Sequence, residues 1–163
     1  IEDAIRLNAS AVAFSIYIGG AYEHQTIVEF SKLVNDAHRY GLPVLAVTAV
    51  GKDMNRDLRY LSLASRIAVE LGADIVKTYY CDGFNELIAA CPVPVVIAGG
   101  KKVPELDALE FAHKAISDGA SGVDMGRNIF QSESPENMIQ AVRSVVVNGE
   151  KPDKAFEQYK NSL

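Results

Sequence analysis

The sequence has 163 residues, a formal net charge of -5 and 48% hydrophobic residues, so it can bury a substantial core. The acidic balance argues against a nucleic-acid interface, which needs a clustered basic face. No apolar run approaches the roughly 20 residues of a membrane span and no secretory signal is apparent, so we expect neither nucleic acid nor membrane among its partners. Cys81 and Cys91 lack metal-ligand and redox spacing, which favours structural thiols in a cytoplasmic protein.

Apolar runs and amphipathic segments alternate along the whole sequence. The amphipathic segments predict helices at residues 1–8, 22–40, 56–71, 83–90, 105–118 and 135–147, and glycines end most of them. The apolar runs predict strands at residues 11–19, 43–50, 73–80, 94–99 and 122–125. Residues 151–163 form a polar tail that we expect to be helical from Asp153 and to pack on the outside. No linker interrupts the series, so we predict one domain over residues 1–163.

Strands that read as continuous apolar runs predict a parallel α/β sheet buried on both faces by helices. Two architectures fit this pattern, an open doubly wound sheet and a TIM (β/α)8 barrel. The length suits the open sheet, because a barrel typically needs about 250 residues. The polar residues described below favour the barrel, with this chain as its C-terminal part, roughly strands 4 to 8. Such a piece exposes two sheet edges, so we expect these residues alone to be inactive or to need a partner.

One lysine, Lys77, lies inside the apolar strand at residues 73–80. A buried ammonium is costly unless it is paired or loses its proton. Desolvation lowers the pKa of a lysine, and the neutral amine can attack a carbonyl to form a Schiff base. The alternative is that Lys77 lies at the strand end, reaches water and makes a structural ion pair.

Glycine-rich turns follow the last two predicted strands. Ligands of parallel α/β folds bind at the carboxyl ends of the strands, where this sequence has Gly99-Gly100 and then Gly126-Arg127. These turns are neighbours if the strands follow sequence order. Their backbone N–H groups can bind a phosphate, and Arg127 adds a bidentate donor. Each feature alone is more often structural, but together they predict a phosphorylated carbonyl compound with its carbonyl near Lys77.

Other candidates carry less weight. Tyr17 and Tyr79 can be core residues or proton carriers, and we favour a core position for the Tyr79 ring with a role for its hydroxyl. Asp124 lies within the last strand and needs a partner if it is buried, for which Lys77 is one candidate. Asp53 fits helix capping as readily as ligand binding. No His, Asp or Glu cluster has metal-ligand spacing, so we expect no metal.

Three motifs resemble the class I aldolase family of archaeal fructose-bisphosphate aldolases, and the resemblance covers essentially the whole chain. They are DIVKTYY around Lys77, IAGGKK at residues 97–102 and GASGVDMGRNIFQ at residues 119–131. The resemblance implies a TIM barrel with Lys77 as the reactive lysine on strand six. It also implies that the substrate phosphate is bound by a set of turn residues, namely Ala98, Gly99, Gly100, Gly126 and Arg127.

Within this family, the YIGG motif at Tyr17 and the VTAVGKDM motif from Val47 look closest to a thiolase branch. That branch implies transfer of an acetyl unit from a phosphorylated diketone to coenzyme A, giving dihydroxyacetone phosphate and acetyl-CoA in autoinducer-2 breakdown. It implies no bound cofactor, with coenzyme A as co-substrate, and a cytoplasmic homo-oligomer, a ring-based decamer. The chain departs from the aldolases at strand five, where they place a proton-donating tyrosine and this sequence reads Thr48-Ala49-Val50.

Two alternatives stay open at this point. A class I aldolase would cleave a phosphorylated ketose through an imine at Lys77, without coenzyme A. A non-catalytic phosphosugar-binding protein would use Lys77 only to pair with a phosphate or carboxylate. Borohydride trapping of an imine and dependence on coenzyme A separate these readings.

Overall fold

The computed structural model describes residues 1–50 and 55–162 and divides the chain into two compact units, Ile1–Val96 and Ile97–Leu163. The single-domain assignment over residues 1–163 stays a prediction. The strands are β1 (Val12–Ile18), β2 (Val44–Val50), β3 (Ile75–Thr78), β4 (Val95–Ala98) and β5 (Gly122–Asp124). They neighbour one another in chain order, and β2 pairs in parallel with both β1 and β3. An open doubly wound sheet reverses its strand order at a switch point, which this order does not do.

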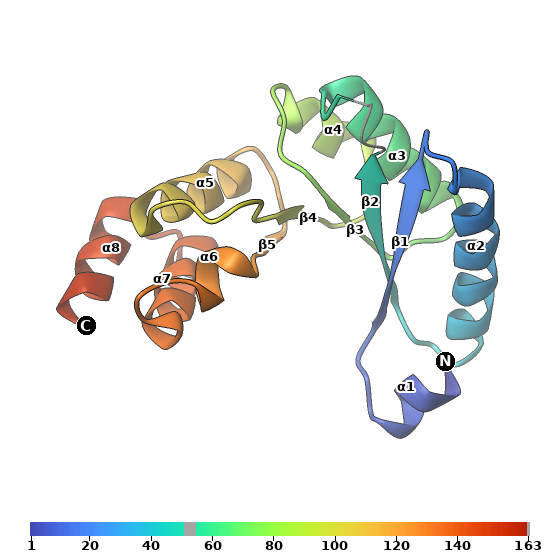
Figure 1. The fold of residues 1–163 in the computed structure, drawn as a ribbon, viewed down its shortest axis with the longest axis horizontal. Coiled ribbons are helices and arrows are strands. Elements are labelled where there is room, and N and C mark those ends of the chain that lie inside the picture. Colours follow the sequence, from blue (N-terminus) through green and yellow to red (C-terminus); the bar gives the residue numbers. More distant parts are fainter. Residues whose placement is uncertain (51–54, 163) are drawn as a thin grey trace. The chain divides into compact units, whose positions relative to one another are not determined.

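Helices follow the strands as the sequence predicts (Figure 1). The first unit contains α1 (Glu2–Arg6), α2 (Glu23–Arg39), α3 (Leu58–Glu70) and α4 (Phe84–Ala90). The second contains α5 (Glu105–Ser117), α6 (Arg127–Phe130), α7 (Pro135–Asn148) and α8 (Pro152–Asn161). The helix α6 was not predicted, because four residues are too few to display helical periodicity.

The two faces of the N-terminal sheet differ in burial. On one face α2 packs on β1 and α3 packs on β2 and β3; there the Phe14 ring lies 6.2 Å from the Phe30 ring of α2. One position along, Ser15 pairs with Val47, and Val47 pairs with Lys77. Because side chains alternate along a strand, these three lie on the opposite face. They are only half-buried, so the prediction of strands buried on both faces is wrong for these residues.

Helix α3 begins one turn later than a cap at Asp53 would place it. Its N-cap is Asp57, whose Oδ1 accepts a hydrogen bond from the Tyr60 N–H at 3.1 Å. This bond satisfies one of the backbone donors that a helix N-terminus leaves unpaired. Asp53 lies outside the described residues, as do the other last residues of the VTAVGKDM motif.

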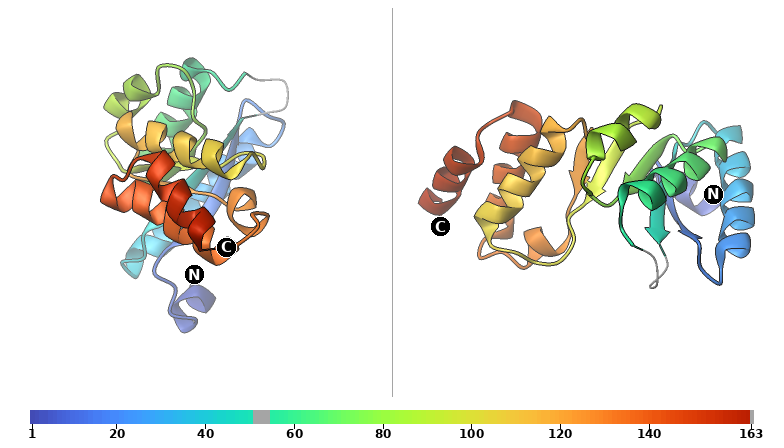
Figure 2. Two further views of the ribbon diagram at one scale, coloured as in Figure 1. Left: turned by 90° about the vertical axis from the view of Figure 1, so that its left-hand side faces the viewer. Right: turned by 90° about the horizontal axis from the view of Figure 1, so that it is seen from above.

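The C-terminal unit has its own core, built where α5, α7 and α8 pack together. Figure 2 shows these three helices, gold to red, side by side. The polar tail was expected on the outside, but α8 buries Ala155 and Tyr159, and the Tyr159 hydroxyl accepts a hydrogen bond from the Ser134 N–H at 3.2 Å. Most other residues of α8 are exposed, so the tail packs on the outside as expected, and two buried residues one helical turn apart dock this mostly polar helix.

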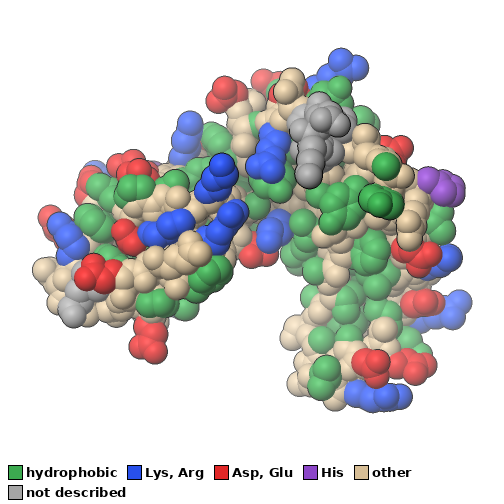
Figure 3. Space-filling view, in the orientation of Figure 1, with side chains coloured by type: hydrophobic (Ala, Val, Ile, Leu, Met, Phe, Trp, Pro, Cys, Tyr) green, Lys and Arg blue, Asp and Glu red, His purple; other side chains and the backbone are tan. Residues whose placement is uncertain are grey.

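Charged side chains of both signs cover the outer side of α2, as Figure 3 shows at its right edge. Apolar side chains lie over β1 and β2 in the same view. Among the described residues, no helix has the length and apolar character needed to cross a membrane.

Candidate active site

Lys77 lies in the middle of β3 with its backbone held between two fully buried neighbours, Val76 and Thr78. Its own side chain projects to the opposite face, where Val47 is its partner on β2. The residue is half-buried rather than enclosed. Lys77 is therefore held on a strand of the sheet without being enclosed in the core.

Two buried threonines lie next to Lys77, Thr48 on β2 and Thr78 on β3. Thr48 and Thr78 are each 1% exposed, and the Thr48 hydroxyl donates to Thr78 Oγ1 at 2.9 Å. The same hydroxyl lies 3.3 Å from the carbonyl oxygen of Lys77. The pair therefore joins β2 to β3 at the lysine. Sequence reasoning considered Thr48 but did not predict its bond to Thr78; a polar residue in each of two adjacent apolar strands was the available signal.

The two tyrosines have different surroundings. Tyr17 is 44% exposed near the end of β1, on the same sheet face as Lys77 but two strands away, so it is not a core residue. Tyr79 follows β3 and is half-buried, with the Arg56 guanidinium 3.8 Å from its ring centre. That contact is a cation–π interaction rather than core packing. A role for the Tyr79 hydroxyl stays a prediction.

The cysteine closest to Lys77 in sequence is a poor nucleophile. Burial raises the pKa of the Cys81 thiol, and the carboxylates of Asp82 and Asp57 raise it further. Burial also raises the pKa of Cys91. Because a thiolate is the reactive form, both cysteines are unreactive at neutral pH, in agreement with structural thiols.

The two glycine turns of the C-terminal unit contact each other. The Gly99 N–H donates to the Asp124 carbonyl at 3.2 Å, and a Cβ on Gly99 would lie 2.6 Å from Met125 Cγ. Gly100 has φ +68°, and a Cβ there would meet no atom within 4 Å. The first glycine is required by close packing and the second by its backbone conformation. The expectation that the two turns are neighbours is confirmed, whereas phosphate binding stays a prediction.

The remaining predicted residues border these turns. Ala98 ends β4 and is half-buried, Gly126 precedes α6, and Arg127 is the exposed first residue of that helix. Asp124 ends β5 and is exposed, so burial does not require it to pair with Lys77.

A second basic residue of the IAGGKK motif is engaged by a carboxylate. Lys102 Nζ lies 2.6 Å from Glu105 Oε1 and also donates to the Val103 carbonyl at 2.8 Å. The hydrogen bond from Lys102 holds the pKa of Glu105 below its ordinary value. Lys101, by contrast, is exposed. Of the two lysines in this motif, Lys101 is the one placed to attract an anion from solvent.

Sequence reasoning placed Asn128 after the last strand but gave it no role. Its side chain is 1% exposed, and its amide makes three hydrogen bonds to the backbone of residues 99–103. Only the asparagine's place directly after Gly126-Arg127 could have suggested it.

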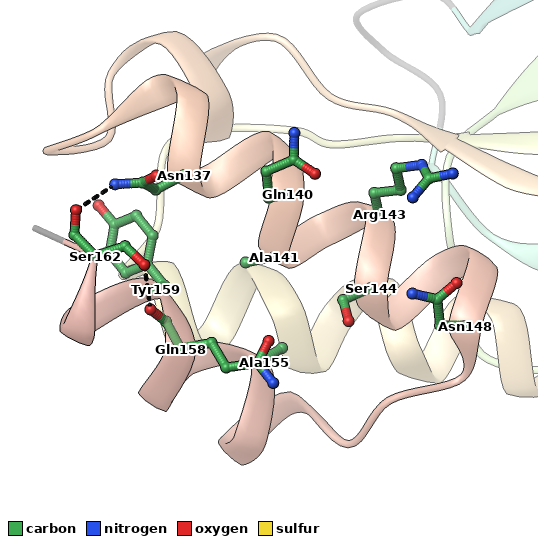
Figure 4. Close-up of a pocket in the computed structure, with 10 residues that line it drawn as sticks. All are labelled: Asn137, Gln140, Ala141, Arg143, Ser144, Asn148, Ala155, Gln158, Tyr159 and Ser162. Carbon is green, nitrogen blue, oxygen red and sulfur yellow. Dashed lines mark hydrogen bonds between the residues drawn. The ribbon is translucent and has the colours of Figure 1, made fainter.

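A polar cavity of about 270 Å³ lies between α7 and α8, away from the glycine turns (Figure 4). Its wall includes Arg143, Ser144 and the amides of Asn137 and Gln140, and one edge is closed by the Asn137 hydrogen bond to the Ser162 carbonyl at 2.7 Å. None of the predicted site residues lines it. Within residues 1–50 and 55–162, no three His, Cys, Asp or Glu side chains are grouped as a metal site.

The sequence pattern of the DeoC/LacD family aldolases matches residues 1–132, which carry Lys77 and both glycine turns. The chain belongs to the DeoC/LacD aldolase family. A 3-hydroxy-5-phosphonooxypentane-2,4-dione thiolase of Photorhabdus laumondii is 59% identical over 160 residues, 98% of this chain and 55% of that protein. An uncharacterized aldolase of Pasteurella multocida has the same identity and coverage.

A solved archaeal fructose-1,6-bisphosphate aldolase is similar to this DeoC/LacD family member in structure. Its catalytic lysine is covalently bound to the carbinolamine intermediate of the substrate, and it matches with a TM-score of 0.84 at 31% identity. The match covers 90% of this chain and 61% of the aldolase. The predicted fold is thereby confirmed: the chain is part of a (β/α)8 barrel of the class I aldolase type. The chain spans about half the length, 55%, of the curated relatives it matches.

Proposed function

We propose that the protein containing this chain is an acyltransferase that transfers the acetyl unit of 3-hydroxy-5-phosphonooxypentane-2,4-dione to coenzyme A. The products are dihydroxyacetone phosphate and acetyl-CoA. The observation that carries the proposal is Lys77, a half-buried amine in the middle of β3, in a chain 59% identical to a thiolase that bears this substrate's name. A strand-borne lysine open to small molecules is what imine chemistry with a ketone requires.

The substrate's structure assigns the lysine its step. It has ketones at carbons 2 and 4, a hydroxyl at carbon 3 and the phosphate on carbon 5. Lys77 Nζ adds to carbon 4 and expels water, giving an iminium. The coenzyme A sulfur adds to carbon 2, the bond between carbons 2 and 3 breaks, and its electron pair enters the iminium as an enamine. The thiol proton ends on carbon 3, and water hydrolyses the imine to release dihydroxyacetone phosphate and the lysine.

The glycine turns of the C-terminal unit supply the phosphate subsite in this proposal. The backbone N–H groups of Gly100 and of the turn at Gly126 donate to the phosphate oxygens, since the Gly99 N–H already donates to the Asp124 carbonyl, and the exposed Arg127 guanidinium adds a bidentate, charge-assisted pair. Carbon 4, to which Lys77 adds in this proposal, is bonded to carbon 5, which carries the phosphate.

Further parts of the proposal follow from the same assignment. Coenzyme A is a co-substrate, and no cofactor is held permanently. The protein acts in the cytoplasm as a homo-oligomer, a decamer of stacked rings, in the breakdown of the phosphorylated autoinducer-2 signal. Native mass spectrometry of the purified protein tests the oligomer directly.

The decisive experiment replaces Lys77 by alanine. We expect Lys77→Ala to lose acetyl-CoA formation by at least about 10³-fold, because the iminium that stabilises the carbanion cannot form. Borohydride with dihydroxyacetone phosphate should add a mass to the unmodified protein and none to the variant. The control is Lys32→Ala, which removes an exposed lysine that pairs with Glu29 on α2. Turnover that survives in Lys77→Ala would refute the lysine's role.

A second candidate is a class I aldolase that cleaves a phosphorylated ketose at the same lysine. The likeness to an aldolase whose catalytic lysine carries a carbinolamine favours it. Cleavage of a phosphorylated ketose without coenzyme A would establish this alternative. If the protein binds phosphosugars but forms no borohydride-trapped adduct, the non-catalytic reading holds instead.

A further inference from the structure

Asn128 is the one buried amide in the described part of the glycine-turn region, and its hydrogen-bonding capacity is almost fully used. Its Oδ1 accepts from the Val103 N–H at 2.9 Å. Its Nδ2 donates to the Gly99 carbonyl at 2.7 Å and to the Lys101 carbonyl at 3.2 Å. Both amide hydrogens are therefore spent on carbonyls that lie on either side of Gly100.

These two bonds determine which way the peptide groups of the turn face. In a planar trans peptide the C=O and N–H point in opposite directions. When the Gly99 carbonyl points to Asn128, the N–H of Gly100 in the same peptide unit points away from it. The Lys101 carbonyl likewise turns the Lys102 N–H outward. Asn128 thus draws two partial negative charges behind the turn and presents two partial positive charges in front of it.

The surroundings of Gly100 agree with an open front. Its φ of +68° lies in the left-handed region that glycine adopts readily, and an added Cβ would meet nothing within 4 Å. Asn128 directly follows Arg127 in the sequence, so the short helix α6 carries both the Asn128 amide and the exposed Arg127 guanidinium.

We propose that Asn128 is a positioning residue that orients the turn at residues 99–103 so that the backbone N–H groups of Gly100 and Lys102 face a phosphate. The inference rests on the phosphate subsite of the proposed function. It adds a residue that touches no substrate and acts only through the direction of the peptide groups.

Asn128→Asp is the informative variant, because it keeps the shape and Oδ1 but replaces the two donors by a second acceptor. A carboxylate oxygen facing the Gly99 and Lys101 carbonyls is repulsive, so the turn should rotate. Asn128→Ser is the second variant, since its shorter hydroxyl keeps one donor and should give an intermediate effect. The matched control is Asn137→Asp, which removes a single amide hydrogen bond from the first turn of α7 to the Ser162 carbonyl.

The readout compares two ligands that differ only in the phosphate. In borohydride trapping at Lys77, Asn128→Asp should raise the half-saturating concentration of dihydroxyacetone phosphate about tenfold, about 1.4 kcal/mol. That of dihydroxyacetone should change less than about twofold, and Asn137→Asp should change neither. If Asn128 had only a general structural role, the variant would weaken the binding of both ligands equally. That result, or unchanged binding of both ligands, would overturn the inference.

Calorimetry with inorganic phosphate keeps this test separate from the catalytic proposal. If the unmodified protein traps no adduct, the lysine mechanism fails, but weaker phosphate binding by Asn128→Asp still supports the positioning role of Asn128. If the variant binds phosphate as tightly as the unmodified protein, the positioning role of Asn128 is refuted while the lysine mechanism is unaffected.

Discussion

Two Gly-Gly turns follow strands of this chain, and their polar partners are opposite in kind. After β1, the Gly19 N–H donates to Glu23 Oε2 at 2.5 Å, so a carboxylate of the protein occupies the anion position. After β4, the amide of Asn128 takes the Gly99 carbonyl instead. At the first turn, a carboxylate of the protein itself accepts the backbone N–H. At the second turn, Asn128 binds two carbonyls, so that the N–H groups of Gly100 and Lys102 point away from it.

The comparison shows why a glycine pair alone does not indicate a ligand site. Both pairs follow parallel strands, and both contain a residue in the left-handed region, Gly19 at φ +75° and Gly100 at φ +68°. What differs is the side chain that reaches each turn, Glu23 from α2, which follows β1, and Asn128 from α6, which follows β5. An acidic side chain there predicts a structural turn, and an amide donor behind the turn predicts a site for an external anion.

The largest expected effect comes from adding one methyl group at the second turn. A Cβ on Gly99 would lie 2.6 Å, 2.9 Å and 3.0 Å from Met125 Cγ, Cβ and Cα, atoms too close to the backbone to move independently. We expect Gly99→Ala to lower the free energy of unfolding by about 2 kcal/mol or more in urea titrations. Gly20→Ala is the matched control, because its Cβ would first meet the Tyr17 carbonyl oxygen at an ordinary 3.5 Å. Equal losses in the two variants would contradict this packing difference.

A smaller effect separates stability from binding. Gly100 and Gly41 both have φ +68°, and at both an added Cβ would meet nothing within 4 Å. Alanine at either position should therefore cost about the same, about 1 kcal/mol for the left-handed conformation. Only Gly100→Ala should also weaken the binding of inorganic phosphate, measured by calorimetry. Gly41 ends α2, far along the chain from either phosphate turn, so Gly41→Ala should leave phosphate binding unchanged. Unchanged phosphate affinity in Gly100→Ala would remove the second turn from the binding site.

Periodicity predicted the elements of the barrel because each strand and long helix repeats its signal over several residues. It missed α6, which has four residues, and it did not show that Ala155 and Tyr159 dock α8 onto the C-terminal core. Lys77 was visible because a charge inside an apolar strand is rare. The half-burial of its sheet face was not visible, since Val47 and its neighbours are apolar on both faces.

Asn128 could not be predicted because its role depends on three backbone groups at residues 99–103, 25 to 29 positions earlier in the chain. No local pattern records that pairing. The same holds for the buried Thr48–Thr78 hydrogen bond, which forms only once β2 and β3 lie in register. Contacts across strands and between loops therefore set the limit of sequence reasoning in this chain.

The smallest expected effect is the pH dependence of a carboxylate that, like Glu23, accepts a backbone N–H. Asp74 Oδ2 accepts from the Val44 N–H at 2.8 Å and lies 2.9 Å from His38 Nε2. Partial burial raises the pKa of Asp74, but the Val44 and His38 hydrogen bonds and the His38 charge outweigh it, so the pKa is lowered. A lowered pKa means stabilisation that is present above the unfolded-state pKa and lost as pH falls through the folded-state value.

Asp74→Asn should therefore lower the free energy of unfolding at about pH 6 by no more than about 1 kcal/mol, because the side chains of His38 and Asp74 are 44% and 43% exposed. The gap from the unmodified protein should shrink as the pH falls from about 5 toward 3, in urea titrations at each pH. Asp36→Asn on the exposed side of α2 is the control and should show no such gap. A gap that does not change with pH in Asp74→Asn would contradict a stabilising role for the Asp74 carboxylate, because only a titrating carboxylate makes the gap depend on pH.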